Sequence, residues 1–321
     1  MVDANTVPIG GIHHVTAIAA DPQRNLDFYA GALGLRLVKR TVNFDDPGTY
    51  HLYYGDGAGS PGSILTFFPY VGAHQGRHGV GQAAETRFAV PKSSVGHWVE
   101  RLMRHHVTAD GPAPRFGDGA PVLSFRDPDG LMLELVGLDE PSGGAVGWNG
   151  APVPAEHAIR RILGVSLWLE SYDRSAALLT GPMGFRAVAE EGDRHRYAGP
   201  GAAEVELRCA PGFWPGAMGA GTVHHVAFRV PDLAAEEAAR VTLAREAGLD
   251  VTPVLDRQYF RSVYFREPGG VLFEIATDPP GFAADEPAEA LGLSLKLPAW
   301  LEPRRETIER RLPELHAPVR R

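Results

Sequence analysis

The sequence contains a single cysteine, Cys209, so no disulfide can form within the chain. It also lacks an apolar run of the roughly 18 residues that a membrane-spanning helix requires. Residues 1–10 have neither the basic start nor the apolar stretch of a secretory signal. Together these absences predict a protein of the reducing cytoplasm that has no membrane partner.

Positive charge is scarce as well. The chain has 31 Lys and Arg against 39 Asp and Glu, a net charge of -8, and its short basic clusters, Arg304–Arg305 and Arg320–Arg321, lie near the end. Because nucleic-acid binding needs clustered cations, the sequence predicts no nucleic-acid partner. Its 44% apolar and 22% charged content is typical of a globular protein, and 321 residues suffice for two ordinary domains.

The chain repeats itself internally. Residues 88–91 (FAVP) match residues 228–231 (FRVP), and at the same offset residues 125–134 match residues 265–274. At a slightly different offset, residues 31–36 (GALGLR) match residues 181–186 (GPMGFR). The repeats define four modules that start near Ile12, Thr86, Ile162 and Val223, in which the first resembles the third and the second resembles the fourth.

Each module has the pattern of a strand, a helix and three further strands. In the first module we expect a strand at 12–18, a helix at 22–33, and strands near 35–42, 49–55 and 63–68. In the fourth, residues 234–247 predict the helix, and residues 126–130 and 266–270 predict hairpin turns. The fold class is therefore α+β: four βαβββ modules whose curled mixed sheets form two domains.

The linker follows from composition. Residues 141–157 are rich in Gly and Pro, so we expect an N-terminal domain at 1–140 with modules one and two, and a C-terminal domain at 158–280 with modules three and four. Residues 281–321 form a tail, for which residues 299–315 predict a helical part.

Two dipeptides, His13-His14 and His224-His225, open strand-like runs, and Glu274 lies within the apolar strand at 271–275. Two imidazoles and one carboxylate on the buried side of strands indicate a metal site. This ligand set is typical of Fe(II) and leaves coordination positions open.

The pairing of the modules decides which side chains meet. The repeat places four residues at one inward position of the first strands: His14, Glu85, Gly164 and His225. Inward glutamates occupy last strands of the second, third and fourth modules: Glu134, Glu206 and Glu274. Pairing one with two, or three with four, gives one imidazole with two carboxylates, and pairing two with three gives carboxylates alone. We predict that module one pairs with module four, the only pairing that brings two imidazoles to one ion.

Strand alternation refines this site. It places His14 and Thr16 on one face and His13 on the other, and by the same rule makes His225 the ligand and His224 its neighbour. A buried carboxylate needs a partner, which the metal provides for Glu274. Glu134 needs a partner too, and the sequence does not identify it.

These motifs resemble those of a known family. The runs IHHVT at 12–16, VHHVAF at 223–228 and PGGVLFE at 268–274 are similar to ring-cleaving dioxygenases of the vicinal oxygen chelate superfamily, and more closely to the hydroquinone-cleaving branch. Supporting matches occur along nearly the whole chain, at residues 38–42, 50–54, 153–157, 194–197, 285–286 and 291–292.

The resemblance implies one Fe(II) per chain, held by His14, His225 and Glu274, with Mn, Zn or Ni as replacements in purified samples. It implies that an aromatic diol and O2 are the partners. It also places five residues around the metal as catalytic residues: His13, Thr16, His224, Arg257 and Tyr264. We further expect a homo-oligomer.

Two other functions are compatible with the sequence. One is a glyoxalase-like lyase or isomerase with Zn(II) or Ni(II), and the other is a metal-free protein that binds a small aromatic molecule. Four aromatic residues are candidates for the walls of the cavity: Phe67, Phe68, Trp214 and Phe260.

Overall fold

The structure is a computed structural model that describes residues 6–117, 119–141 and 148–318. Residues 1–5 and Arg320–Arg321, which entered the arguments on targeting and charge, lie outside the described residues, as do residues 142–147 of the predicted linker. The predicted domain boundaries therefore stay a prediction. None of the described helices is long and apolar enough to cross a membrane.

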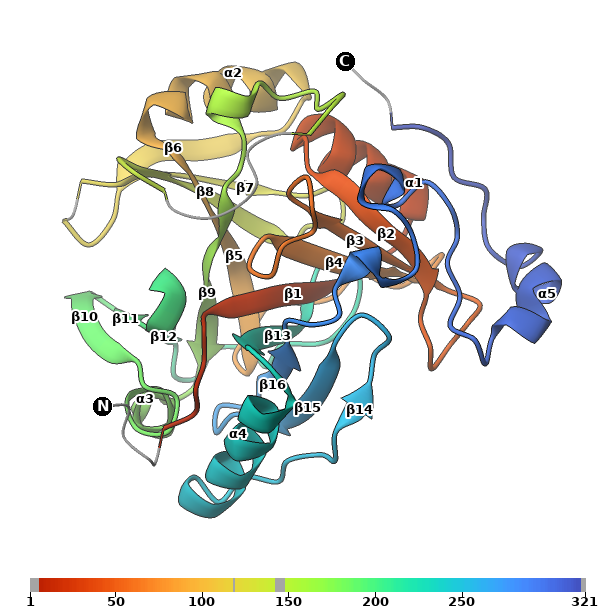
Figure 1. Ribbon diagram of the computed structural model, residues 1–321. Helices are drawn as coiled ribbons and strands as arrows, with labels where there is room; N and C mark the ends of the chain where they lie inside the picture. The colour runs from red at the N-terminus through yellow and green to blue at the C-terminus, as the bar shows by residue number, and fades with distance from the viewer. Residues whose placement is uncertain (1–5, 118, 142–147, 319–321) are drawn as a thin grey trace.

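Two eight-stranded mixed sheets form the body of the molecule (Figure 1). The first sheet contains, in spatial order, β14 (Leu255–Asp256), β15 (Arg261–Arg266), β16 (Leu272–Thr277), β13 (Val223–Val230), β1 (Ile12–Ala19), β4 (Ile64–Pro69), β3 (Tyr50–Gly55) and β2 (Arg36–Val42). The second contains β10 (Arg186–Glu191), β11 (Arg194–Ala198), β12 (Glu204–Cys209), β9 (Arg161–Leu169), β5 (Gln82–Pro91), β8 (Met132–Leu138), β7 (Pro121–Arg126) and β6 (Ala109–Pro114).

The order of the strands shows which modules pair. In the first sheet β1 runs antiparallel to β13, so modules one and four share this sheet. In the second sheet β5 runs antiparallel to β9, so modules two and three share the other. The predicted pairing of module one with module four is confirmed, and so is the α+β class with curled mixed sheets. We call the concave sides of the two sheets the first cup and the second cup.

One helix follows the first strand of each module. These helices are α1 (Pro22–Leu26, continued by a π-helical turn at Asp27–Ala32), α2 (Val95–Arg104), α3 (Asp173–Thr180) and α4 (Leu233–Glu246). The Asp21 and Asp232 side chains cap α1 and α4 by accepting backbone N–H groups. Figure 1 shows α1 and α2 on one side of the strands and α3 and α4 on the other.

The predicted hairpin turns tie the modules together. The Asp127 carboxylate accepts the Leu131 N–H at 2.8 Å within its own turn, and the Tyr29 hydroxyl of module one at 2.9 Å. Glu267, at the same place in the turn before β16, accepts the Val271 N–H at 2.9 Å and the Ser175 hydroxyl of module three at 2.5 Å. The bonds of Glu267 fix the start of β16, the strand that carries Glu274.

The tail runs back along module one. The Lys39 ammonium, buried in β2, lies 2.6 Å from the Asp285 carboxylate, and Arg40 forms a bridge with Leu295. The tail is partly helical, as predicted: within the stretch 299–315 the helix consists of a 3-10 turn (Glu302–Arg304) and α5 (Arg305–Glu309). The apolar residues of this stretch are too sparse for a long amphipathic helix, and Pro313 has no N–H to continue one.

The remaining 3-10 turns are Lys92–Ser94, Ala155–His157, Pro200–Ala202, Phe282–Ala284 and Ala288–Ala290.

Candidate metal centre

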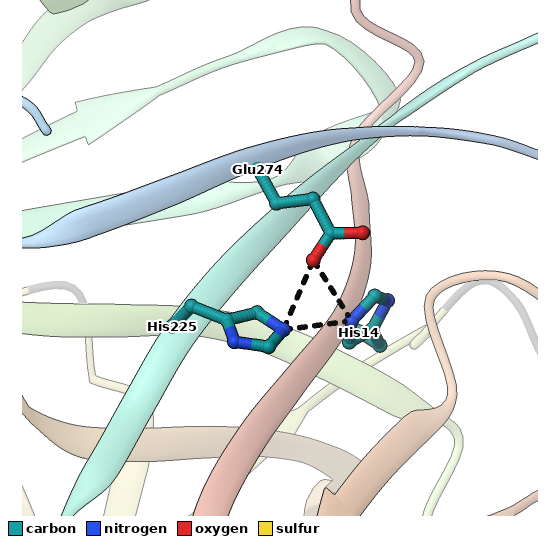
Figure 2. A group of neighbouring side chains, drawn as sticks. All are labelled: His14, His225 and Glu274. Carbon is teal, nitrogen blue, oxygen red and sulfur yellow. Dashed lines mark hydrogen bonds and ion pairs between the residues drawn. The ribbon is translucent and has the colours of Figure 1, made fainter. Parts of the chain in front are cut away.

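Three buried side chains from neighbouring strands meet in the first cup (Figure 2). His14 comes from β1, His225 from β13 and Glu274 from β16. The two Nε2 atoms lie 3.2 Å apart, and Glu274 Oε2 lies 2.9 Å from His225 Nε2 and 3.4 Å from His14 Nε2. In the described part of the chain this is the only group of three His, Cys, Asp or Glu side chains close enough to hold one ion.

A β-bulge precedes each of the two histidines. Ile12 pairs with Phe228 and His14 with Ala227, so His13 is an extra residue in β1. Thr16 pairs with His225 and Ala17 with Val223, so His224 is the extra residue in β13. The predicted alternation, with His13 and His224 on the opposite face, is wrong at these two positions, because a bulge re-aims the side chain of its extra residue.

The re-aimed histidines contact their neighbours. His13 Nδ1 lies 2.9 Å from His14 Nδ1, and His224 Nδ1 lies 2.8 Å from His225 Nδ1. Burial lowers the pKa of His13 well below its ordinary value and that of His224 to about 3, so both rings are neutral. A neutral ring can accept the Nδ1–H of its neighbour, which leaves the Nε2 lone pairs of His14 and His225 free to bind a metal.

The environment of Glu274 tests whether a cation fits. The Ser262 hydroxyl donates a hydrogen bond to Oε1, but Oε2 accepts none from the residues that the structure describes. Burial alone would raise the pKa of Glu274. The neighbouring His14 and His225 together lower it by more than burial raises it, so the pKa lies well below its ordinary value. A buried anion therefore points an unpaired oxygen at two nitrogen lone pairs. Ligand bonds of about 2.1 Å at right angles bring ligand atoms to about 3 Å of one another, as found here.

His14 and His225 line a small cavity of about 250 Å³. Phe260 forms one wall and packs against the rings of His13 and His14, with ring centres 5.0 and 5.1 Å apart. Phe68 also lines the cavity. The other two aromatic residues predicted as walls are elsewhere, because Phe67 is buried in the core and the Trp214 side chain is 70% exposed.

Arg257 and Tyr264 both line this cavity, as predicted. Arg257 Nε donates to the Tyr264 hydroxyl at 3.2 Å, and Tyr264 pairs with Glu274 across β15 and β16. Burial raises the pKa of Tyr264 above its ordinary value, so the phenol is neutral. Thr16 is buried beside β4, with its hydroxyl 3.2 Å from that of Thr66.

Sequence reasoning missed five polar residues of the cavity: Asn43, Asp45, His51, Tyr53 and Tyr70. Asn43 donates to the Tyr70 hydroxyl at 2.9 Å, and the Tyr53 hydroxyl lies 2.8 Å from His51 Nδ1. The signal for two of them was present, since residues 50–54 alternate and place His51 and Tyr53 on one face of β3.

The fold and this geometry agree with the comparisons. The Glyoxalase/Bleomycin resistance protein/Dioxygenase superfamily matches residues 11–135 and 161–275. The chain belongs to this superfamily. The two matches cover all four modules, so the second cup, formed by modules two and three, has the same architecture as the first cup, which holds the candidate metal site.

Individual superfamily members are similar over nearly the whole chain. The "Putative ring-cleaving dioxygenase MhqO" of Bacillus subtilis is 49% identical over 94% of this chain and 95% of its own length. The chlorohydroquinone/hydroquinone 1,2-dioxygenase of Sphingobium indicum is 34% identical over 92% of this chain and 93% of its own. A crystal structure of a dioxygenase-like protein from B. subtilis, 46% identical, superposes with a TM-score of 0.91 and covers 96% of this chain and 98% of that one.

The second cup has a different set of side chains at the positions of the ligands. Bulges occur at the equivalent positions, but Leu163 and Ala84 occupy them in place of histidines. The internal repeat puts Gly164 at the position of His14, and Glu85 at that of His225. Glu134 of β8 corresponds to Glu274 of β16. No imidazole is left at these positions.

Arginines neutralise the carboxylates of the second cup. Arg115 binds both oxygens of Glu134 at 2.7 and 2.8 Å, which identifies the partner that the sequence left open. Arg194 binds Glu85 at 3.1 and 3.2 Å. Arg87, fully buried, lies 2.7 Å from Glu206. Because guanidinium groups supply the positive charge there, this cup does not need a metal cation.

Proposed function

We propose that the protein is a ring-cleaving dioxygenase that uses Fe(II), one per chain, to insert both atoms of O2 into an aromatic diol of the hydroquinone type. The observation that carries this proposal is the convergence of two imidazole Nε2 atoms, which belong to residues that line a small cavity, and one otherwise unpaired carboxylate oxygen. Two nitrogen ligands and one oxygen ligand on one side of an ion are typical of non-haem Fe(II) oxygenases.

Fe(II) held by His14, His225 and Glu274 would supply the open coordination positions and the electron transfer that dioxygen chemistry requires. The Arg257 guanidinium stabilises negative charge on the substrate oxygen nearest the metal site. Tyr264, kept protonated by burial, can donate a hydrogen bond to the same region. Phe68 and Phe260 hold the ring, and the small cavity limits the entry of water.

The cavity volume supports a single-ring substrate. At about 250 Å³ it lies below the usual range for drug-sized ligands, roughly 300–1,000 Å³. Similarity to a named hydroquinone dioxygenase supports a diol with two oxygens on one ring. We extend the proposal to a cytoplasmic homo-oligomer, supported by the single cysteine and by exposed apolar side chains such as Val71 and Trp214.

Oxygen uptake tests the proposal. The protein is loaded with Fe(II) without oxygen and then mixed with hydroquinone or catechol in oxygenated buffer. We expect about one O2 consumed for each ring opened, and a loss of activity of at least about 100-fold in His14→Ala and Glu274→Ala. Turnover without oxygen would favour a lyase or isomerase, and wild-type protein that binds no metal would favour a metal-free binding protein; either result would contradict the proposal.

A further inference from the structure

A row of hydrogen-bonded side chains crosses the wall of the first cup from β3 to β1. The Tyr53 hydroxyl lies 2.8 Å from His51 Nδ1, and His51 Nε2 lies 2.6 Å from the Thr66 hydroxyl. The Thr66 hydroxyl lies 3.2 Å from that of Thr16. The row therefore links β3, β4 and β1, and its Tyr53 end lines the cavity.

Both His51 and Tyr53 point into the cup. Their rings pack at 4.0 Å, and His51 also packs on Phe68 at 4.2 Å. The second cup supports this orientation. Tyr53 pairs with Thr66 as Arg196 pairs with Glu206, and both Arg194 and Arg196 lie within 3.4 Å of the inward Glu206 carboxylate.

The row leaves one bonding position open at Tyr53. Burial lowers the pKa of His51 well below its ordinary value, so the ring is neutral and has one N–H and one lone pair. If the Tyr53 O–H donates to Nδ1, the phenol oxygen can still accept a hydrogen bond. If Nδ1–H donates to Tyr53 instead, the phenol O–H is free to donate. Tyr53 can thus match a ligand hydroxyl in either role.

Other polar groups of the cavity are less suited to a buried ligand oxygen. Tyr264 accepts from Arg257 and is assigned above to the oxygen nearest the metal site, and Asn43 is bonded to Tyr70. The Asp45 side chain is 82% exposed and lies 3.6 Å from Arg257. Tyr53 is only 2% exposed. A ligand without a polar group at this position would leave the buried Tyr53 hydroxyl unpaired, which is costly, so the position favours a ligand that carries a hydroxyl there.

We propose that Tyr53 binds the second hydroxyl of a para-diol whose first oxygen lies at the His14, His225 and Glu274 site, and that His51 is the residue that positions Tyr53. The inference rests on the proposed function for the identity of the substrate. A para-diol carries its oxygens at opposite ends of the ring, so it can contact two separate sites in one cavity. A catechol carries them on adjacent carbons, so it leaves Tyr53 unpaired.

The test compares two probes that differ only in the distal oxygen. Hydroquinone and phenol are titrated without O2 into Fe(II)-loaded protein of equal iron content. We expect wild type to bind hydroquinone at least about tenfold more tightly than phenol, which is the ratio that one buried hydrogen bond provides. Tyr53→Phe should remove this ratio while leaving the affinity for phenol unchanged.

Two further variants separate positioning from structure. His51→Leu should lower the hydroquinone-to-phenol ratio, and His51→Gln, which keeps a donor and an acceptor, should restore part of it. The matched control is Tyr54→Phe, which removes a buried hydroxyl from the opposite face of the same strand and should leave the ratio unchanged.

Either of two results would overturn the inference. One is a wild-type ratio near one, and the other is an equal loss of both affinities in Tyr53→Phe, which would indicate only a structural role. Failure of the proposed function would look different. In that case no diol would support oxygen uptake in wild type, whatever the ratio of the two affinities.

Discussion

Glu274 and Glu134 occupy equivalent positions in β16 and β8 but have different partners. Glu134 is held by Arg115 through two hydrogen bonds, whereas Glu274 lies against two imidazole nitrogens and a single hydroxyl. The same residue type at the same repeat position thus forms an ion pair with Arg115 in one cup and belongs to the candidate metal site in the other. At this scale the partners, and not the glutamates, distinguish the two cups.

Glu236 is a second buried carboxyl with a measurable consequence. It lies in the first turn of α4, and neither of its oxygens accepts a hydrogen bond from the described residues. Burial, aided by the negative charge of Glu274, raises its pKa from 4.5 to about 7. Between these two values the unfolded chain releases a proton that the folded chain keeps, so the carboxyl destabilises the fold increasingly as the pH rises, up to about pH 7.

Glu236→Gln removes this cost. We expect the variant and wild type to have similar free energies of unfolding near pH 4.5, and the variant to be more stable by about 2 kcal/mol at pH 8. Urea unfolding at a series of pH values measures the difference. The exposed neighbour Glu237, paired with Arg240, is the control, and Glu237→Gln should gain no stability at any pH. A gain in Glu236→Gln that does not depend on pH would contradict the assignment.

At the scale of elements, the paired bulges of β1 and β13 give the site its shape. The second sheet has the same bulges with Leu163 and Ala84, so the backbone forms them without histidine. His13→Leu and His224→Ala, which copy those residues, should therefore fold normally. Each removes the Nδ1 partner of a ligand histidine and should weaken Fe(II) binding roughly 10–100-fold. Anaerobic metal titration measures the affinity, and an unchanged affinity would contradict the role of the bulge residues.

The sequence predicted the elements better than their details. The repeats located the strands, the helices and the turns at 126–130 and 266–270, because turn residues and apolar periods are local signals. The bulges were missed, because the run Ile12–Val15 alternates like a regular strand and the extra residue is defined only by its pairing with β13, more than 200 residues away. His51 and Tyr53 were missed as site residues for a related reason, since the curl of the sheet brings β3 to the cavity.

At the scale of the whole molecule, the first and last modules complete one cup and the two central modules complete the other. Ligand chemistry alone predicted this pairing. It could not supply the arginines of the second cup, because Arg115 reaches Glu134 from a loop, and Arg194 reaches Glu85 from β11, which β12 and β9 separate from β5 in the sheet. The path of the tail along β2 was also beyond the sequence, since it depends on a buried Lys39 that pairs with Asp285.

The second cup should stabilise the fold without any metal. Arg87 is fully buried and lies 2.9 Å from Glu204 and 2.7 Å from Glu206. Arg87→Leu leaves these carboxylates without their main partner and should lower the free energy of unfolding by about 3–5 kcal/mol. Arg87→Lys, which keeps the charge, should lose less. Urea unfolding of metal-free protein provides the measurement, and an Arg87→Leu variant as stable as wild type would contradict this role.

The central claim is that a single cup binds the metal, and iron content tests it most directly. Wild type, Glu274→Gln and Glu134→Gln are loaded with Fe(II) without oxygen, freed of excess metal and analysed for iron per chain. We predict one iron in wild type, one in Glu134→Gln and close to none in Glu274→Gln. Retention of one iron by Glu274→Gln, or loss of iron in a folded Glu134→Gln, would contradict the claim.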